Sequence, residues 1–388
     1  MVGFVTANIT VIATLPPSTQ TPMRPADASP VATPGAATRQ ARRGHGRATL
    51  ADVARAAGVT AITVSRYLRQ PARVAPATAR AVAAALLATG YLPNKQAGVL
   101  ASAAMAPAGG ARMVAALIPS IANSIFAETV QGLADALQGS GCELLLAATG
   151  YSAEREEEQL RALLGWFPSA LVVTGRKHSP GALALLRQAQ SRGTPVIEIW
   201  DHHPEPGAEC FTQIGFDHEQ VGRAMAEHLI ERGHRHLAYV DSGVAEDFRA
   251  HERGDGFLAA AKRRGVPARR VTAPAIEAID AGRRALAELL GSGGRPCVRA
   301  AAFANDHLAC GALFEARARG LAVPHDLALL GFGDFSLGRQ LDPPLSTVHT
   351  PRFEIGQAAA QALLQSLESG LPAADARLPW TLIARGSS

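Results

Sequence analysis

The strongest constraint on the fold lies after residue 111, where short apolar runs alternate with amphipathic segments of about ten to eighteen residues. The apolar runs are MVAALIP (113–119), ELLLAAT (143–149), SALVVTG (169–175), PVIEIW (195–200), QIGF (213–216), HLAYVD (236–241), RAAAFA (299–304) and LALLGFG (327–333). Short apolar strands that alternate with helices predict parallel sheets covered by helices on both faces. About 275 residues are too many for one such sheet, so we expect an α/β body of two doubly wound lobes. Ligands of such sheets bind at the carboxyl ends of the strands, and here these ends can face one cleft.

Three helical patterns precede this body. The first helix carries four apolar residues on one face, Leu50, Val53, Ala54 and Ala57. Gly58 is expected to end it, and Thr60 to cap a second helix whose inward face is Ile62 or Val64 together with Leu68. A third helix is expected over 77–89, before Gly90.

Charge is distributed unevenly between the two parts. Residues 39–104 hold ten Lys and Arg against the single acid Asp52, although the net charge of the whole chain is only +5. A basic segment on a mildly acidic body is typical of a phosphate-binding head on a regulatory domain. The alternative is a solvated charged surface.

The first 47 residues are rich in Thr, Pro, Ala and Ser and offer little large apolar area, so we expect them to be disordered. The opening MVGFVTANITVIATL lacks the basic region of a secretory signal. An initiation codon placed too far upstream is an equally good explanation of it. With no window long and apolar enough to span a bilayer, we expect a cytoplasmic protein without a membrane partner.

Motifs for catalysis and for metals are absent from the sequence. GFGDFSLG (331–338) lacks the third glycine of a dinucleotide fingerprint, and neither a nucleophile elbow nor a phosphate-binding loop occurs. Two histidine pairs have the wrong spacing for a metal site on a helix: His202 with His203, and His234 with His236. The four cysteines lie far apart in the sequence and show no zinc-binding spacing: Cys142, Cys210, Cys297 and Cys310. We therefore expect no enzyme, no cofactor and no metal.

The segment TLADVARAAGVTAITVSRYLRQPARVAPATARAVAAALLATGYLPN resembles the helix-turn-helix headpiece of the lac repressor family of bacterial transcription regulators. The body resembles the same family in ANDHLACGALFEARARGLAVPHDLALLGFGD, PPLSTVHTPRFEIGQAAAQALL and RGHRHLAYV. Within this family, three segments are most similar to gluconate-utilisation repressors: WFPSALVVTGRKHSP, RGHRHLAYVDS and GYSAEREEEQLRALL. The resemblance implies an all-α helix-turn-helix headpiece plus an α/β body, its two doubly wound lobes being of the periplasmic-binding-protein type.

Four segments follow from this reading. Residues 1–47 are a disordered N-terminal extension, and 48–92 form the helix-turn-helix DNA-binding domain. Residues 93–110 form a hinge helix and linker, and 111–388 form the two-lobed effector-binding and dimerisation domain.

In the headpiece, the second helix is the expected recognition helix. Arg66 is the candidate for a bidentate guanine contact, because its fork matches the O6 and N7 acceptors. Hydroxyls at Thr60, Thr63 and Ser65 suit phosphate oxygens. Two further positions, Ala61 and Ile62, either touch thymine methyl groups or only shape the helix.

The resemblance also implies that the hinge helix, over 95–102, orders on DNA with Leu100 wedged into the minor groove, beside Asn94 and Lys95. Gly98 lowers the stability of this helix, by about 1 kcal/mol relative to alanine.

For the effector, the resemblance places Phe126, Arg253, Asn305, Asp306 and Asp334 at the cleft. Gly333 stands where the family has an acidic residue, which puts a neutral-sugar geometry in doubt. Three further candidates are Arg176, His178 and Arg249; with Arg253 they suit an anionic polyol, since a guanidinium pairs with a carboxylate. Arg176 and Arg249 could equally be ordinary surface arginines.

These features together predict a homodimeric repressor of carbohydrate or sugar-acid metabolism. Its partners are a double-stranded, near-palindromic DNA operator and a small sugar or sugar-acid effector such as gluconate, which releases it. A dimer is expected because no C-terminal heptad zipper is present. The alternative is a periplasmic-type sugar-binding receptor without DNA function, which would need an export signal and no DNA-binding head.

Overall fold

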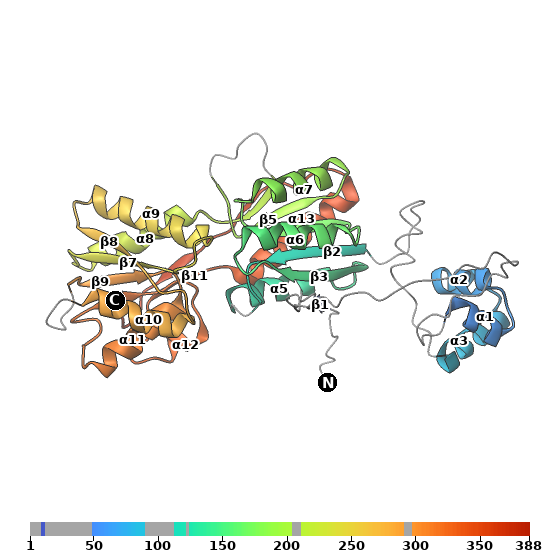
Figure 1. The fold of residues 1–388 in the computed structure, drawn as a ribbon, viewed down its shortest axis with the longest axis horizontal. Coiled ribbons are helices and arrows are strands. Elements are labelled where there is room, and N and C mark those ends of the chain that lie inside the picture. Colours follow the sequence, from blue (N-terminus) through green and yellow to red (C-terminus); the bar gives the residue numbers. More distant parts are fainter. Residues whose placement is uncertain (1–8, 12–48, 90–111, 122–123, 204–210, 291–296) are drawn as a thin grey trace, which may run out of the picture. The chain divides into compact units, whose positions relative to one another are not determined.

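The computed structural model describes residues 9–11, 49–89, 112–121, 124–203, 211–290 and 297–388. The chain divides into two compact units, one of residues 14–111 and one of residues 1–13 with 112–388 (Figure 1). The expected hinge helix, with Asn94, Lys95 and Leu100, lies outside the described residues. Within the expected disordered extension, Ile9–Val11 instead form a strand, β1, because this β-branched run pairs with an open sheet edge.

The smaller unit is a helical domain with its own core. Its elements are α1 (Leu50–Ala57), α2 (Ala61–Arg69), the 3₁₀ turn η1 (Pro71–Arg73) and α3 (Pro76–Thr89). Its buried core consists of Val53, Ala54, Val64, Val82 and Ala85. All three helices contribute to this core, as the apolar spacing predicts.

Local signals fix the ends of these helices. Thr49 and Asp52 form a capping box at the start of α1, with the Thr49 amide 2.9 Å from Oδ2 of Asp52. Gly58 ends α1 with a φ of 66°, a conformation that favours glycine. Thr60 caps α2 by accepting a hydrogen bond from the Thr63 amide at 3.3 Å. The predicted roles of Gly58 and Thr60 are therefore confirmed.

The first lobe of the body is a parallel sheet with helices on both faces. The strand order is β1 (Ile9–Val11), β3 (Cys142–Ala148), β2 (Arg112–Ile118), β4 (Ala170–Thr174), β5 (Val196–Ile199), β6 (Thr212–Gly215) and β12 (Ala376–Arg377). The helices are α5 (Ser124–Leu137), α6 (Ala153–Leu164), α7 (Pro180–Ser191) and α13 (Arg352–Ser369). Leu160, Leu163 and Leu186 of α6 and α7 pack on one face of the sheet, while α5 and α13 lie on the other. Helices α5 and α13 approach closely through Gly132 and Gly356.

The second lobe is also parallel and doubly wound. Its strand order is β10 (Ala328–Leu330), β9 (Ala300–Phe303), β7 (Leu237–Asp241) and β8 (Ala268–Thr272). Its helices are α8 (His218–Glu231), α9 (Phe248–Arg263), α10 (Ala278–Leu289), α11 (Asp306–Ala318) and α12 (Ser336–Arg339). A separate antiparallel pair joins β11 (Thr347–His349) to β13 (Thr381–Ile383).

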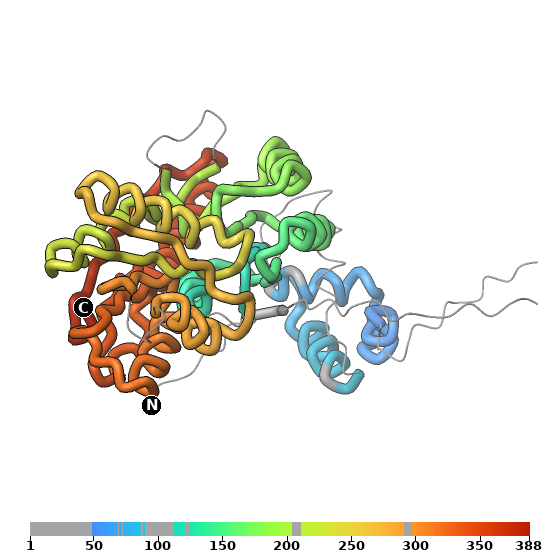
Figure 2. The backbone as a smooth tube through the Cα atoms, turned by 60° about the vertical axis from the view of Figure 1, so that its left-hand side comes forward, coloured from blue at the N-terminus to red at the C-terminus, as the bar shows by residue number. Residues whose placement is uncertain are grey.

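The chain passes between the lobes more than once, so that its C-terminal part contributes to both (Figures 1 and 2). All eight expected strands are present, within one to three residues of their expected ends. Strand β8 was not expected, because ARRVT holds two arginines and reads as polar. Among the described residues, no helix is both long and apolar enough to cross a bilayer.

Candidate functional site

The second helix of the small unit presents two distinct faces. Val64 is buried, and Leu68 packs against the same core. On the outside, Ile62 is 71% exposed and Arg66 is exposed one turn later, so the two share one face of α2. Of the two alternatives for the inward position, the structure therefore selects Val64.

The other predicted DNA contacts lie at the start of the same helix. Ala61, Thr63 and Ser65 are partly exposed, and the hydroxyls of Thr60 and Thr63 are 3.0 Å apart. The Thr60 oxygen also accepts the capping hydrogen bond, so the Thr63 hydroxyl makes fewer hydrogen bonds within the helix. The assignment of all six residues to DNA stays a prediction.

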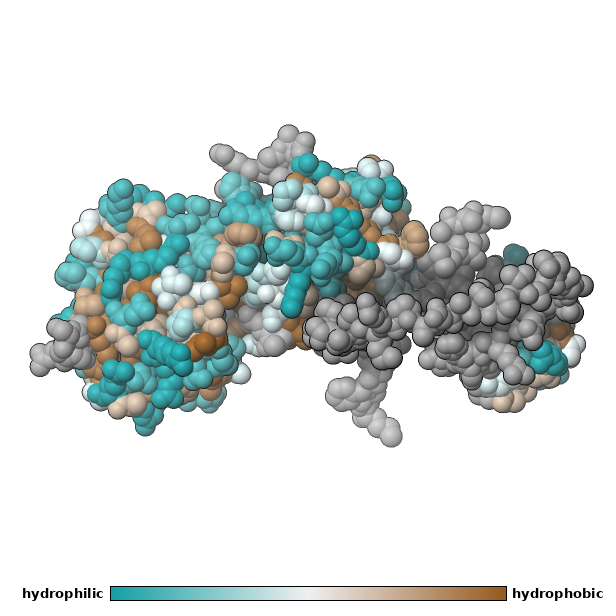
Figure 3. Space-filling view, in the orientation of Figure 1, coloured by the Kyte–Doolittle hydropathy of each residue, from teal (hydrophilic) through white to brown (hydrophobic). Residues whose placement is uncertain are grey.

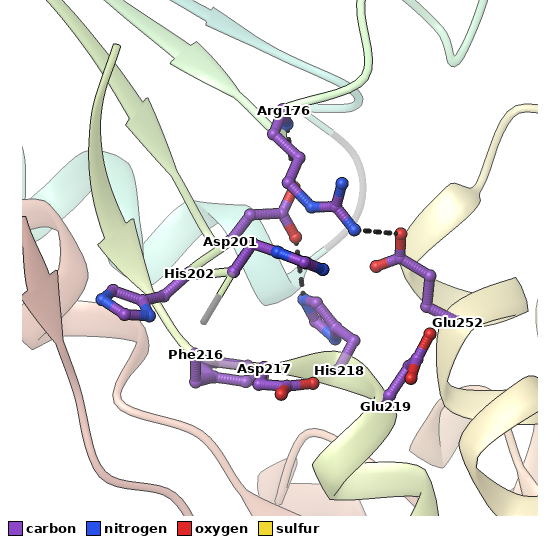
Figure 4. A pocket seen from close by; sticks show the side chains of 9 residues that line it. Arg176, Asp201, His202, Phe216, Asp217, His218, Glu219 and Glu252 are labelled. Carbon is purple, nitrogen blue, oxygen red and sulfur yellow. Dashed lines mark hydrogen bonds and ion pairs between the residues drawn. The ribbon is translucent and has the colours of Figure 1, made fainter. Parts of the chain in front are cut away.

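In the body, charged side chains from both lobes meet at the carboxyl ends of β4 and β5 (Figure 4). Arg176 follows β4 and donates to Oε1 of Glu252 in α9 at 2.7 Å, and Lys177 contacts the same oxygen at 2.7 Å. The Arg176 amide donates to Oδ2 of Asp201 at 2.9 Å. These groups enclose a cavity of about 60 Å³, lined by Arg176, Asp201, His202, His203, Phe216, Asp217, His218, Glu219 and Glu252.

His218 occupies the floor of this cleft as a neutral imidazole. Nη1 of Arg253 lies 2.9 Å from Nδ1, and since arginine only donates, Nδ1 is the acceptor. Nε2–H then donates to the Trp200 carbonyl at 2.9 Å. Burial, followed by the positive charge of Arg253, lowers the pKa of His218 well below its usual value. Burial and the positive charge of Arg253 therefore keep His218 neutral, and the neutral ring in turn accepts a hydrogen bond from Arg253.

Arg253 is held firmly in the cleft. Besides His218, it donates to the Ala304 carbonyl at 2.8 Å, and its guanidinium lies 3.8 Å from the centre of the Phe332 ring. Only 4% of the residue is exposed. The structure thus places this predicted effector residue at the lobe boundary with two of its nitrogens already hydrogen-bonded.

Asp201 and Arg249 are two charged residues of the cleft whose charges are poorly compensated. Asp201 is buried, and burial raises its pKa to about 6 although Arg249 opposes the rise. Arg249 is 9% exposed and has no hydrogen-bond acceptor among the described residues. Its guanidinium approaches the backbone at Gly175, where an added Cβ would lie 2.6 Å from Nη1. Gly175 therefore leaves room for a cation that reaches across from α9.

Aromatic rings form the wall behind these charges. Phe126 packs edge-on against Trp200 at 5.6 Å, and Trp200 against Phe216 at 5.9 Å. Arg249 lies 5.9 Å from the centre of the Phe126 ring. Phe126 thus packs behind the charged groups of the cleft, and its contact with an effector stays a prediction.

The structure places His178 elsewhere, on the α6 side of the first lobe. Its Nδ1 is 2.5 Å from Oε1 of Glu156, and its Nε2 is 3.4 Å from Oε1 of Glu198. Burial disfavours the charged form, but the two carboxylates outweigh it and raise the pKa of His178 to about 9. His178 is thus engaged by two carboxylates of the first lobe, and its contact with an effector stays a prediction.

Three predicted residues of the second lobe are engaged within that lobe. Asn305 caps α11 by accepting from the Leu308 amide at 3.0 Å. Asp306 accepts from the Thr347 hydroxyl at 2.6 Å and from the Phe335 amide at 2.7 Å. Burial raises its pKa to about 6.

Asp334 is engaged even more completely. Arg339 and Arg385 each lie 2.6 Å from its oxygens, and His349 lies 3.1 Å away. Burial disfavours its charge, yet the two arginines outweigh burial and lower the pKa of Asp334. The contacts of Asp306 and Asp334 account for their burial without a ligand, and the effector roles of all three residues stay predictions.

Four buried polar residues of the lobe boundary were not predicted from the sequence: Asp201, His218, Glu252 and Arg352. Asp201 directly follows the expected strand PVIEIW, and its place at a strand end was a usable signal. The other three lie inside a helix or at its first residue, where the neighbouring sequence carries no motif that would identify them as site residues. Among the described residues no group of three metal-ligating side chains comes together.

Comparisons with known proteins agree with this architecture. Residues 49–94 match the family model for bacterial regulatory proteins of the lacI family, and residues 226–388 match a periplasmic binding protein-like domain. The HTH-type transcriptional regulator GntR of Pseudomonas aeruginosa is 38% identical, over 89% of this chain and 97% of its own. GntR of Escherichia coli is 35% identical, over 82% and 91%.

Solved structures show the same likeness. A lacI-family regulator from Silicibacter pomeroyi has 31% identity and a TM-score of 0.77, over 88% of this chain and 99% of its own. The lac repressor dimer bound to operator has 25% identity and a TM-score of 0.71, over 88% and 99%.

Proposed function

Because the chain belongs to the lacI family of bacterial regulatory proteins, which are DNA-binding transcriptional regulators, we propose that it is a repressor that a sugar acid such as gluconate releases from its operator. The alternative of a transport receptor does not account for the helix-turn-helix unit. The observation that carries the proposed effector is the set of nearly buried guanidinium groups at the lobe boundary.

An acid suits this cleft better than a neutral sugar does. Arg249 and Arg253 are at most 9% exposed, and Arg249 has no acceptor among the described residues. The nearest carboxylate, Asp201, has a pKa raised to about 6 by burial; it is ionised at neutral pH, but Arg176 also acts on it, so Arg249 does not have this counter-charge to itself. A guanidinium binds a carboxylate through charge-assisted, often bidentate, hydrogen bonds. An anionic polyol would therefore supply the missing counter-charge.

We place the DNA-reading function in residues 48–92, a hinge helix and linker in 93–110, and effector binding and dimerisation in 111–388. A homodimer would set one headpiece on each half of a near-palindromic site. The operator-bound lac repressor dimer, a structural relative, supports this assembly. Leu100, with Asn94 and Lys95, would contact the centre of the operator.

In this mechanism binding replaces chemistry, and no catalytic step is needed. Closure of the lobes on the acid would change the geometry of the linker and disfavour the DNA-bound state. Effector and operator then weaken each other by one reciprocal free energy, typically about 1–3 kcal/mol.

The first test is a selection of DNA from a random-sequence pool with the full chain. We expect enrichment of a near-palindrome, bound by two copies of the chain as measured by light scattering of the complex. A pool without sequence enrichment, or a complex of one chain per site, would contradict the proposal.

A further inference from the structure

Arg352 begins α13, at the point where the chain passes from β11 to the first lobe. The residue is only 6% exposed. Its Nη2 donates to Oε1 of Glu128 in α5 at 2.9 Å. Nε and Nη1 are fully buried, and neither reaches an acceptor among the described residues.

A second unpartnered group lies two residues earlier. The hydroxyl oxygen of Thr350 is buried and has no hydrogen-bond partner in the described part of the chain. Buried polar groups in folded proteins are nearly always hydrogen-bonded, because an unpaired one loses its solvation without compensation. Two such groups, one of them a permanent cation, therefore indicate a site that a ligand completes.

The surroundings of Arg352 define what this ligand must carry. The Phe335 ring, from the second lobe, lies 5.3 Å from the guanidinium and offers no acceptor. Asp306 is close enough for Arg352 to act on its charge, but its oxygens already accept from Thr347 and Phe335. Glu128 is 54% exposed, so its charge is partly screened by solvent. The positive charge of Arg352 is thus incompletely compensated.

The other arginines of the lobe boundary differ in this respect. Arg176 is paired with Glu252, and Arg253 uses both terminal nitrogens on His218 and Ala304. Arg352 alone among these three keeps both Nε and a terminal nitrogen buried and unpartnered. Arg249 has no acceptor among the described residues either, but of these four arginines only Arg352 combines two unpartnered nitrogens with complete burial of both.

We propose that Arg352, with the Thr350 hydroxyl two residues earlier, receives the carboxylate of the effector. This assignment rests on the proposed function, since it identifies which residues at the lobe boundary read the acid. A site built to bind a carboxylate rejects the neutral analogue, because the analogue leaves the buried donors unpaired. Arg352 and Thr350 would therefore set the preference for a sugar acid over the corresponding sugar alcohol.

The test compares gluconate with sorbitol, which carries an alcohol in place of the carboxylate, by calorimetric titration of the full chain. For the unchanged protein we expect gluconate to bind more tightly. Arg352→Gln should weaken gluconate binding on the order of 100-fold, and leave sorbitol binding nearly unchanged. Arg283→Gln, which removes an exposed arginine from α10, serves as the matched control and should change neither.

Two further variants separate recognition from structure. Glu128→Gln removes the competing carboxylate, so gluconate should bind as tightly as before or more tightly. Thr350→Val keeps the shape of the side chain and removes only the hydroxyl, and we expect a several-fold loss for gluconate alone. Without ligand, Arg352→Gln should melt no lower than the unchanged protein, because a neutral amide leaves fewer buried donors unpaired.

The outcomes distinguish this proposal from the one it rests on. If the unchanged protein binds no aldonate or uronate, the sugar-acid effector itself is refuted. If it binds gluconate and Arg352→Gln binds it equally well, only the assignment to Arg352 fails. A lower melting temperature with equal loss of both ligands would show a structural role, and would also overturn the assignment.

Discussion

Arg176 of the first lobe and Glu252 of the second are joined by a 2.7 Å ion pair between Nη2 and Oε1 (Figure 4). Lys177 shares the same carboxylate. Hydrophilic residues also gather on the surface across the boundary between the lobes (Figure 3). Because these residues come from α9 and from the end of β4, the ion pair holds the two lobes together across the cleft.

Glu252→Gln should lower the stability of the body modestly. It removes the partner of two cations, and the side chains of Arg176 and Glu252 are only 27% and 11% exposed. Exposed ion pairs contribute up to about 1 kcal/mol, and we expect a loss of that order in the free energy of unfolding. Urea denaturation at low salt measures it, with the exposed Glu246→Gln as control. Equal stability of the two variants would show that the pair does not hold the lobes.

Asp201→Asn should change how stability depends on pH. Burial raises the folded-state pKa of Asp201 to about 6, above its ordinary value of 3.8. The folded chain therefore binds more protons than the unfolded chain between these values, and stability falls as pH rises from about 4 to about 6. The amide removes this ionisation, so the variant should be more stable at pH 7.5, by roughly 3 kcal/mol.

The measurement is urea denaturation of both proteins at pH 4.5 and at pH 7.5. Other groups titrate in this interval, so the informative quantity is the difference between variant and unchanged protein at each pH. We expect a gain at pH 7.5 that shrinks at pH 4.5, whereas the exposed Asp135→Asn should show neither. A variant that is less stable at pH 7.5 would mean that Arg249 stabilises the ionised carboxylate more than burial opposes it.

Features set by neighbouring residues were predictable from the sequence. Gly58 and Thr60 act within one turn of their own helices, and the eight apolar strands are marked by their composition. The alternation of strands and helices was enough for the two-lobed body. Strand β8 escaped because Arg269 and Arg270 hide its pattern.

Roles that depend on contacts between residues far apart in the sequence were harder to predict. His178 follows β4 just as Arg176 does, but the structure places it with Glu156 and Glu198 on the α6 side of the sheet. Asp334 looked available for a ligand until the structure brought Arg339 and Arg385 against it. Nothing near Arg352 in the sequence shows that its donors are buried and unpaired.

Arg66→Ala should abolish specific DNA binding. The side chain is exposed on the outward face of α2, and a bidentate contact with guanine contributes about 1–3 kcal/mol of discrimination. Fluorescence anisotropy should show that only weak, salt-sensitive association remains. Arg80→Ala, on α3, removes the same charge from an exposed position and should weaken all sequences alike. Retained sequence preference in Arg66→Ala would show that another residue reads the bases.

The central claim is that an acid bound by the body controls DNA binding by the headpiece. Its most direct test is the operator affinity of the full chain at fixed salt, measured by anisotropy with and without saturating gluconate, related aldonates and sorbitol. We expect an acid of this panel to weaken operator binding about 5- to 150-fold, and sorbitol to have little effect. Unchanged affinity across all the acids would contradict the account.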